Sequence, residues 1–183
     1  MESRDIRILV VVDMQKDFVD RALGTKEAVA IVPAVAEKIR QYARRGDVIL
    51  ATRDTHEPEY LQTREGKHLP VPHCIRGSEG WQLCGEVAAA LPPEAVIVDK
   101  PTFGSTALAE LVGEYVARYG AEHVHAELVG LCTDICVVSN ALLLKAFYPE
   151  MPLSLDPSCC AGVTPESHEA ALSTMRMCQI DIR

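Results

Sequence analysis

The sequence lacks any apolar run of the roughly 18–20 residues that a membrane-spanning helix needs. It also lacks a basic stripe: 18 Lys and Arg face 26 Asp and Glu, the formal net charge is -8, and Arg44-Arg45 is an isolated pair. We therefore expect neither a membrane nor a nucleic-acid partner, because both bind through clustered Lys and Arg. The N-terminal segment shows no small-residue cleavage site, so we expect no signal peptide.

No pair of cysteines has the CxxC spacing of a zinc finger. The chain has 7 cysteines, an odd number, and they are scattered, mostly within apolar sequence. This pattern is typical of a reducing compartment rather than of a disulfide framework, so we expect a cytoplasmic protein. The adjacent pair Cys159-Cys160 is interpreted as structural.

Internal repeats, low-complexity segments and linkers are also missing, and 183 residues with 48% hydrophobic content predict a single domain, 1–183. Apolar runs of strand length alternate with helix-length segments, and the last of them is a candidate edge strand. The runs are 6–12, 48–52, 95–98, 123–131, 151–155 and 179–182. The alternation predicts a three-layer α/β/α, Rossmann-like fold with a six-stranded, mostly parallel sheet.

The segments between the strands carry start and stop signals for helices. Pro33 is placed in the first turn of one helix, which Gly46 ends. Ser105 caps a helix that ends at Gly120, and Thr164 with Pro165 begins the last one. A short helix is expected over 81–91. Residues 53–80 show no periodicity, and a loop of that length is typically functional or disordered.

Polar side chains directly follow the predicted strands: Asp13, Asp54, His56, Lys100 and Cys136. The carboxyl ends of parallel strands meet at one edge of a sheet, where ligands bind. Cys136 also stands where a helix begins, and free N–H groups there favour a thiolate. The alternative is a half-buried structural cysteine, since free cysteine is among the most buried residue types.

A cysteine, an aspartate and a lysine at one edge suit acyl transfer. Cys136 would be the nucleophile, and Asp13 would take its proton and pass it to a leaving amine. Lys100 would favour both anions, and backbone N–H groups of the 131–136 turn would receive an oxyanion. Without the cysteine, Asp13 and Lys100 would be read as a salt bridge at the edge of the sheet.

The 53–80 segment concentrates histidine and carboxylate. Asp54-x-His56 and His73 offer oxygen and imidazole ligands suited to Zn²⁺, Mn²⁺ or Fe²⁺, with Glu65 and His68 as further candidates. A polar cluster without a metal is the competing interpretation. Phe18 and Phe103 adjoin the proposed catalytic residues, so they are read either as core or as walls for a flat substrate.

Together these residues resemble the isochorismatase-like cysteine hydrolases, and within them the nicotinamidase (pyrazinamidase) type, over essentially the whole length. The opening Asp13-Met14-Gln15-Lys16-Asp17-Phe18 is similar to the D-x-Q-x-D-F motif of the family. Two segments of the chain, Asp54-x-His56 and Pro72-His73-Cys74-Ile75-x-Gly77-Ser78-x-Gly80, resemble the metal-binding motifs of nicotinamidases. The segment Asp99-Lys100-x-x-Phe103-x-Ser105 is similar to the catalytic lysine segment of the family. The segment Gly130-Leu131-Cys132-Thr133-Asp134-Ile135-Cys136-Val137 is similar to its nucleophile motif.

The resemblance implies hydrolysis of nicotinamide to nicotinate and ammonia through a thioester at Cys136, in a salvage role for pyridine nucleotides. It implies a cis peptide at Leu131-Cys132, with the amides of Cys132 and Cys136 as the oxyanion hole. A divalent metal, with zinc favoured over manganese or iron, would bind the pyridine nitrogen. Its implied ligands are Asp54, His56, His73 and, as the fourth, Glu65. Relatives form dimers and tetramers, so a homo-oligomer is expected.

Two positions depart from the family pattern. Pro70 stands where many nicotinamidases have an aromatic residue, which changes one wall of the ring pocket. Cys132 replaces a small residue such as alanine, and a second thiol there could form a reversible disulfide with the nucleophile. The alternatives are an amidase for another small amide, of the N-carbamoylsarcosine, biuret or maleamate type, and a non-catalytic ligand-binding protein.

Overall fold

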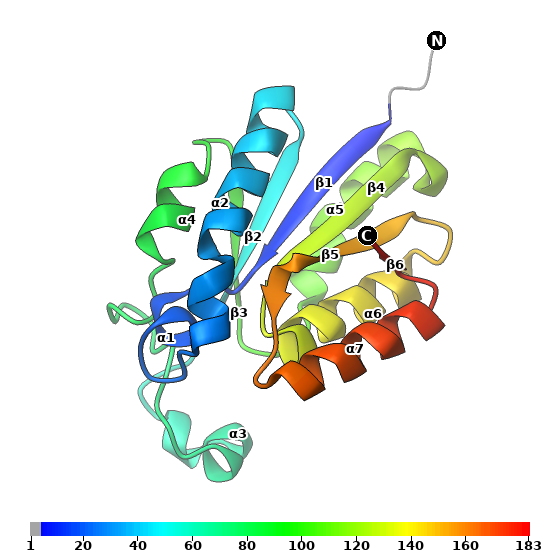
Figure 1. The fold of residues 1–183 in the computed structure, drawn as a ribbon. Helices are drawn as coiled ribbons and strands as arrows, with labels where there is room; N and C mark the ends of the chain where they lie inside the picture. Colours follow the sequence, from blue (N-terminus) through cyan, green and yellow to red (C-terminus); the bar gives the residue numbers. More distant parts are fainter. Residues whose placement is uncertain (1–4) are drawn as a thin grey trace.

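The computed structural model describes residues 5–183 as a six-stranded sheet with helices on both faces (Figure 1). Residues 1–4, which begin the N-terminal segment discussed for a signal peptide, lie outside this range. All neighbouring strands are parallel, in the order β3-β2-β1-β4-β5-β6. The strands are β1 (Ile6–Val12), β2 (Val48–Asp54), β3 (Val96–Lys100), β4 (Val124–Leu131), β5 (Leu153–Ala161) and β6 (Asp181–Ile182). The predicted fold class is confirmed.

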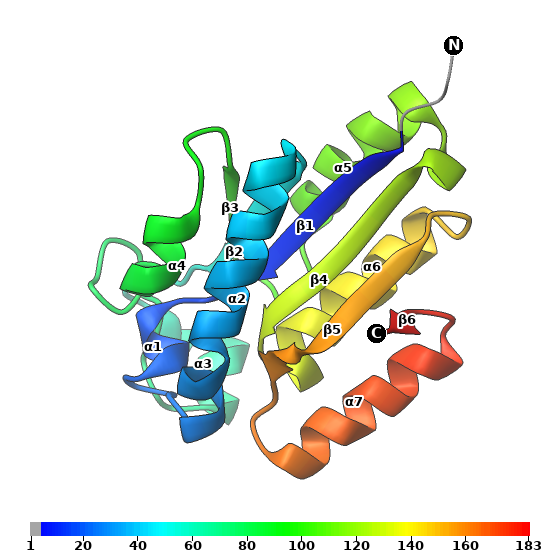
Figure 2. The same cartoon turned by 45° about the horizontal axis from the view of Figure 1, so that its top comes forward.

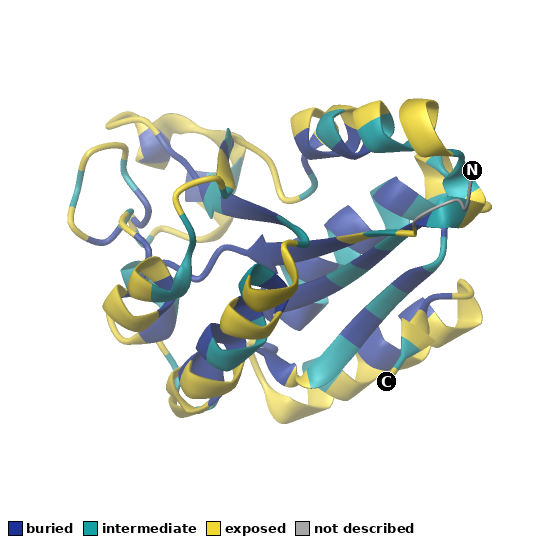
Figure 3. Cartoon of the chain, turned by 90° about the horizontal axis from the view of Figure 1, so that it is seen from above, coloured by how far each residue is buried: buried dark blue, intermediate teal, exposed yellow. Residues whose placement is uncertain are grey.

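Helices cover the two faces of the sheet in separate groups (Figure 2). The apolar sides of α2 and α4 pack on one face, while α5, α6 and α7 pack on the other. Figure 3 shows buried positions along the strands and exposed positions on the outer sides of the helices. The helices are α1 (Lys16–Val19), α2 (Lys26–Arg45), α3 (Arg64–His68), α4 (Gly85–Ala90), α5 (Thr106–Tyr119), α6 (Val138–Phe147) and α7 (Pro165–Met177).

The central strands β1 and β4 have apolar residues on both faces. Residues 8–12 of β1 are fully buried, as expected for a parallel strand covered on two sides. The strand order reverses between β1 and β4, so the connections leave in opposite directions and a crevice opens at their carboxyl ends. The arrowheads of these strands point toward the end of the sheet at which α1 and α3 lie (Figure 1).

Most of the predicted helix caps are confirmed. The hydroxyls of Ser105 and Thr164 accept hydrogen bonds from the first turns of α5 and α7, and Pro165 is the first residue of α7. Gly46 ends α2 with a φ of 71°, which a residue without a Cβ adopts readily.

The predicted start of α2 is wrong. The helix begins at Lys26, so Pro33 lies inside it rather than in its first turn. The actual cap is Thr25, whose hydroxyl accepts a hydrogen bond from the Ala28 N–H at 3.0 Å. Threonine is a preferred N-cap residue. The prediction followed Pro33 instead, because proline is common in the first turn of a helix.

Other boundaries also differ from the sequence prediction. β2 and β3 extend to Asp54 and Lys100, so both residues end strands rather than follow them. The stretch predicted as an aperiodic loop, 53–80, contains the short helix α3 and a single 3₁₀ turn. β5 continues to Ala161 past a register shift, where a strand ending at residue 155 was expected. Within residues 5–183, no helix has the length and hydropathy needed to cross a membrane.

A charge cluster joins α2 to β4 and β5 on one face of the sheet. Lys38 Nζ lies 3.0 Å from Glu127 Oε1 and 2.7 Å from Asp156 Oδ2. The Tyr42 hydroxyl donates to Glu127 Oε2 at 2.5 Å. Burial alone raises the pKa of Asp156, but hydrogen bonds from Lys38 and Ser158 outweigh it and hold the pKa below its usual value.

Replacing Lys38 by methionine should therefore destabilise the fold by about 2 kcal/mol, because two carboxylates of low exposure lose their shared cation. The measurement is the urea midpoint of unfolding. Because the folded pKa of Asp156 is depressed, its contribution is present above the unfolded pKa of about 3.9 and is lost as pH falls through the folded value. The difference between the proteins should be largest at neutral pH and shrink in acid.

The exposed Lys26, on the same helix, supplies the control. Its side chain is 91% exposed, so Lys26→Met should change the unfolding free energy by less than about 0.5 kcal/mol. Equal midpoints for Lys38→Met and Lys26→Met would contradict a stabilising role for the cluster.

Candidate active site

Three side chains meet at the carboxyl end of the sheet, one at the end of β3 and the others in the segments that follow β1 and β4. Lys100 Nζ lies 2.7 Å from Asp13 Oδ2 and donates a hydrogen bond to Cys136 Sγ at 3.4 Å. Asp13 is fully buried, Lys100 is 1% exposed and Cys136 is 5% exposed. The structure thus brings together the three residues that the sequence singled out for nucleophile, base and cation.

Asp13 is held by the neighbouring strand β2. It follows β1 with a φ of 46°, a backbone conformation in which Asp and Asn are enriched. The Thr52 hydroxyl donates to Asp13 Oδ1 at 2.6 Å, and the Asp13 N–H points back to the Thr52 hydroxyl at 3.2 Å. These contacts aim the second carboxylate oxygen, Oδ2, at Lys100.

Lys100 ends β3 in register with Asp54 of β2. Its ammonium donates to the Thr102 carbonyl at 3.1 Å and lies 3.7 Å from Asp54 Oδ1. Burial lowers the pKa of Lys100, but its ionisable neighbours, Asp13 first and then Cys136 and Asp54, outweigh burial and raise the pKa overall. Lys100 is therefore a permanent cation among acidic side chains.

Cys136 lies in a π-helical turn, Thr133–Val137, that runs directly into α6. The sequence predicted a thiolate favoured by a helix N-terminus, and the structure corrects this expectation. Burial raises the pKa of the Cys136 thiol well above its ordinary value, and Asp13 adds to the rise while Lys100 opposes it. The resting sulfur is therefore a thiol that needs a base.

Asp13 is suited to accept that proton. Burial raises its pKa, Lys100 opposes the rise, and the Asp54 carboxylate adds to it. A carboxylate with a raised pKa is a stronger base than an exposed aspartate. The Lys100 ammonium contacts both Asp13 and Cys136. When the thiol proton moves to Asp13, the carboxylate beside Lys100 is neutralised and a thiolate beside the same ammonium takes its place.

Further contacts fix the turn that carries Cys136. The peptide bond between Leu131 and Cys132 is cis, as the resemblance predicts. Asp134 accepts a hydrogen bond from the Val163 N–H at 3.1 Å, and the Thr133 hydroxyl lies 2.8 Å from His168 Nδ1. The turn is thus anchored to the segment that leads into α7.

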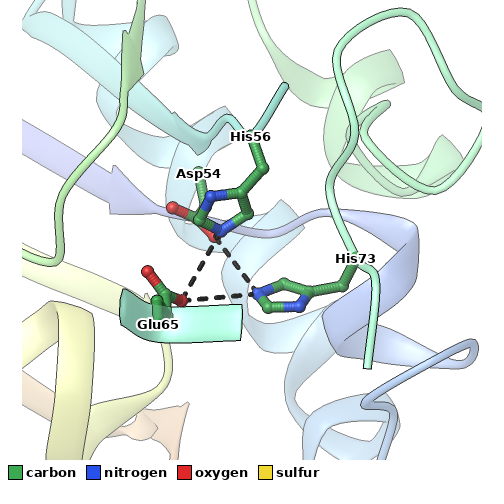
Figure 4. A group of neighbouring side chains, drawn as sticks. All are labelled: Asp54, His56, Glu65 and His73. Carbon is green, nitrogen blue, oxygen red and sulfur yellow. Dashed lines mark ion pairs between the residues drawn. The ribbon is translucent and has the colours of Figure 1, made fainter. Parts of the chain in front are cut away.

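Beside this cluster, four side chains offer ligand atoms that all lie within 4.8 Å of one another: Asp54, His56, Glu65 and His73 (Figure 4). Asp54 Oδ2 lies 2.8 Å from His56 Nε2 and 3.5 Å from His73 Nε2. Glu65 Oε1 lies 3.6 Å and 3.9 Å from the same two nitrogens. The predicted ligand set therefore converges on one point.

The four side chains fit a divalent metal. His56 Nε2 is buried and makes no hydrogen bond among the described residues, which suits a nitrogen whose lone pair is kept for an ion. His73 Nδ1 lies 2.8 Å from the Val71 carbonyl, so it carries the proton and leaves Nε2 as the ligand atom. Two imidazoles and two carboxylates are ligands typical of Zn²⁺.

Glu65 reaches the group from α3, within the segment expected to be irregular. His68, the other candidate from this segment, is not part of the group: it is exposed and its Nδ1 lies 2.8 Å from the Arg64 carbonyl. Tyr60, which the sequence reading did not single out, is buried with its ring 4.7 Å from that of His56 and 5.0 Å from that of His73.

A cavity of about 430 Å³ joins the two clusters. Cys136 lines it together with the metal-group residues Asp54, Glu65 and His73. Both aromatic residues predicted to flank a flat substrate, Phe18 and Phe103, also line it. The cavity is therefore wide enough for a small ring and places such a ring between a thiol and a ligand group.

The two positions that depart from the family pattern also bear on this cavity. Cys132 lines it, and burial raises the pKa of its thiol to about 12, so it is protonated near neutral pH. Pro70 is not among the lining residues, whereas its neighbour Leu69 is. An aliphatic side chain thus contributes to the wall beside the metal group.

Three positioning side chains escaped the sequence prediction: Thr52, Gln15 and Asn140. The Gln15 amide donates to the carbonyls of Asp54 and Trp81 at 2.8 and 2.9 Å, and it accepts from the Asp54 N–H at 2.7 Å. Thr52 and Asn140 are polar residues within otherwise apolar segments, which is a weak signal. The contacts that join these three side chains to other elements span 35 or more positions and leave no local pattern.

Proteins of known structure share this fold. A pyrazinamidase of Pyrococcus horikoshii, solved in complex with zinc, is 30% identical, with a TM-score of 0.82 over 97% of this chain and 98% of that one. A pyrazinamidase/nicotinamidase from Streptococcus mutans UA159 is 26% identical, with a TM-score of 0.84 over 97% and 99%.

Two sequence comparisons agree with the structural ones. The "Uncharacterized isochorismatase family protein PncA" of Bacillus subtilis (strain 168) is 26% identical over 91% of this chain and 92% of its own length. The family described as Isochorismatase domain matches residues 7–182. The two solved structures above are named as pyrazinamidase or nicotinamidase. The chain belongs to the isochorismatase family of hydrolases.

Proposed function

We propose that the protein hydrolyses nicotinamide to nicotinate and ammonia through a thioester at Cys136. The observation that carries this proposal is that one cavity is lined both by Cys136, which contacts Lys100, and by the ligand group around Asp54. A heteroaromatic amide has one group for each part of this cavity: a carbonyl that the Cys136 thiol can attack and a ring nitrogen that a metal can bind. Relatives named as nicotinamidases or pyrazinamidases support this choice.

Catalysis begins with the transfer of the Cys136 thiol proton to Asp13, while Lys100 stabilises the thiolate that forms. The sulfur attacks the amide carbonyl, and the carbonyl oxygen becomes an oxyanion. In the proposal, the backbone N–H groups of Cys132 and Cys136 bind that oxyanion. Asp13 then returns its proton to the amide nitrogen, the C–N bond breaks, and ammonia leaves a thioester on Cys136.

Water completes the cycle. Asp13, again a carboxylate, takes a proton from water as the hydroxide oxygen attacks the thioester carbonyl. The C–S bond breaks, the acid is released, and the proton on Asp13 returns to the Cys136 sulfur. The net reaction consumes one amide and one water and yields one carboxylic acid and one ammonia.

Asp54, His56, Glu65 and His73 would hold the divalent metal, with zinc favoured because two imidazoles and two carboxylates suit it. The metal, when bound, supplies a Lewis-acidic partner for the ring nitrogen of the substrate. Phe18 and Phe103, on the lining of the same cavity, would flank the ring. Phe18 is already packed against the ligand side chain His73, at a ring separation of 5.4 Å.

The first prediction concerns the nucleophile. Cys136→Ala should lower ammonia release from nicotinamide by at least about 10³-fold, because it removes the sulfur that attacks the amide carbonyl. Cys178→Ala, which removes an exposed thiol, should leave the rate unchanged. Coupled detection of ammonia over a panel of small amides provides the measurement. Turnover of N-carbamoylsarcosine, biuret or maleamate with none of nicotinamide would reject the substrate but keep the mechanism.

The second prediction concerns the base. Asp13→Asn keeps the shape of the side chain and tolerates the positive φ, so the fold should survive. Loss of the carboxylate should lower kcat by about 10²–10⁴-fold. Steady-state kinetics with circular dichroism as a check on folding measures this. A folded Asp13→Asn protein with the kcat of the wild type would show that Asp13 is not the base.

The third prediction concerns the metal. Dialysis against a chelator should slow nicotinamide hydrolysis, and added Zn²⁺ should restore it. His73→Ala should purify with far less zinc than the wild type, because it removes a ligand atom. His68→Ala removes a histidine outside the ligand group and should keep its zinc, as measured by elemental analysis. Equal zinc in both variants would mean that the four side chains do not form the site.

A further inference from the structure

Asn140 lies in α6, one helical turn after Cys136, and is 1% exposed. Its amide nitrogen donates to the Cys136 carbonyl at 2.8 Å and to the Phe103 carbonyl at 3.1 Å. Its amide oxygen accepts from the Ser105 N–H at 2.9 Å. The side chain therefore links the turn that carries the nucleophile to the segment that follows Lys100.

The three hydrogen bonds determine the orientation of the amide. Two carbonyl oxygens face the NH₂ group and one N–H faces the oxygen. Rotating the amide by 180° would set its oxygen against two carbonyls and its NH₂ against an N–H, which would break every bond. A buried amide with all its partners is rigid and positions what it contacts.

Asn140 closes a ring of contacts around Lys100. The Lys100 ammonium donates to the Thr102 carbonyl at 3.1 Å, and the Thr102 hydroxyl donates to the Gly104 carbonyl at 2.6 Å. The N–H of the next residue, Ser105, donates to the Asn140 amide oxygen, and the Asn140 amide nitrogen donates to the Cys136 carbonyl. Lys100 itself completes the ring by donating to Cys136 Sγ at 3.4 Å.

Gly104 shows how closely this segment approaches α6. A Cβ added at Gly104 would lie 3.3 Å from the Ser139 carbonyl oxygen, which is tighter than an ordinary van der Waals contact. The segment can therefore rest against the helix at the point where the Asn140 amide reaches it. Phe103, a 46% exposed residue that lines the cavity, has its backbone carbonyl bonded by the same amide.

We propose that Asn140 is a positioning residue that sets the Lys100 ammonium and the Phe103 ring relative to the Cys136 sulfur. It touches neither substrate nor the reacting atoms and acts through the backbone of residues 102–105. The effect on turnover rests on the proposed amidase function, whereas the effect on the reactivity of the Cys136 thiol does not. A side chain that served stability alone would leave both properties unchanged in the folded protein.

The test compares Asn140→Ala and Asn140→Ser with Ser139→Ala. Alanine removes all three bonds. Serine can bond the carbonyl four residues earlier, that of Cys136, but cannot reach the 103–105 segment. Ser139→Ala alters the adjacent, half-buried side chain of the same helix and serves as the matched control. For each protein, kcat and KM for ammonia release are measured with the rate of Cys136 alkylation by iodoacetamide, located by mass spectrometry.

We expect both Asn140 variants to lose about 10–100-fold in kcat, since misplacement of a catalytic group by about 1 Å costs up to 10²-fold. KM should rise because Phe103 loses its anchor. Alkylation of Cys136 should slow several-fold because Lys100 no longer supports the thiolate, while zinc content stays that of the wild type. Ser139→Ala should match the wild type in every measurement.

Wild-type kcat and alkylation rate in folded Asn140→Ser would overturn the proposal, even with a lowered unfolding temperature. Should Asn140→Ala fail to fold, the serine variant decides, because it retains the bond within the helix. Absence of amide turnover in the wild type would reject the proposed function. Slower alkylation of Cys136 in the Asn140 variants would still support the positioning role in that case.

Discussion

The buried ammonium of Lys100 is the interaction on which the site depends. It lies 2.7 Å from the Asp13 carboxylate, 3.7 Å from the Asp54 carboxylate and 3.4 Å from the Cys136 thiol, and all three residues are shielded from water. A charge moved from water into a protein interior costs several kcal/mol unless it is paired, so the cation and its anions must fold together. The parallel sheet makes this feasible because β1, β2 and β3 end side by side.

Asp54 couples the two halves of the site. One of its carboxylate oxygens faces Lys100 at 3.7 Å, and the other faces His56 at 2.8 Å. Burial alone raises the pKa of Asp54, but the adjacent His56 and His73 side chains, together with the charge of Lys100, hold the pKa well below its usual value. The catalytic cluster and the ligand group thus share one carboxylate, which explains why they line the same cavity.

The sequence predicted the sheet and the residues at its edge, because apolar runs and polar residues at strand ends are local signals, whereas the full ligand set with Glu65 followed from the family resemblance. It failed where partners are distant. The supporting contacts of Thr52 with Asp13 and of Asn140 with residues 103–105 join separate elements. The pKa of the Cys136 thiol is raised by burial and by Asp13, and neither effect can be read from the local sequence. The start of α2 was placed too late because proline is common in first turns, whereas Pro33 lies inside the helix.

The split origin of the ligand side chains links metal binding to folding. Asp54 ends β2 and His56 follows at once, whereas Glu65 and His73 belong to the long excursion that carries α3 away from the sheet (Figures 1 and 4). An ion held by all four would act as a cross-link that tethers this excursion to the sheet. Its binding free energy would then count toward the stability of the segment, so one wall of the cavity would depend on metal supply.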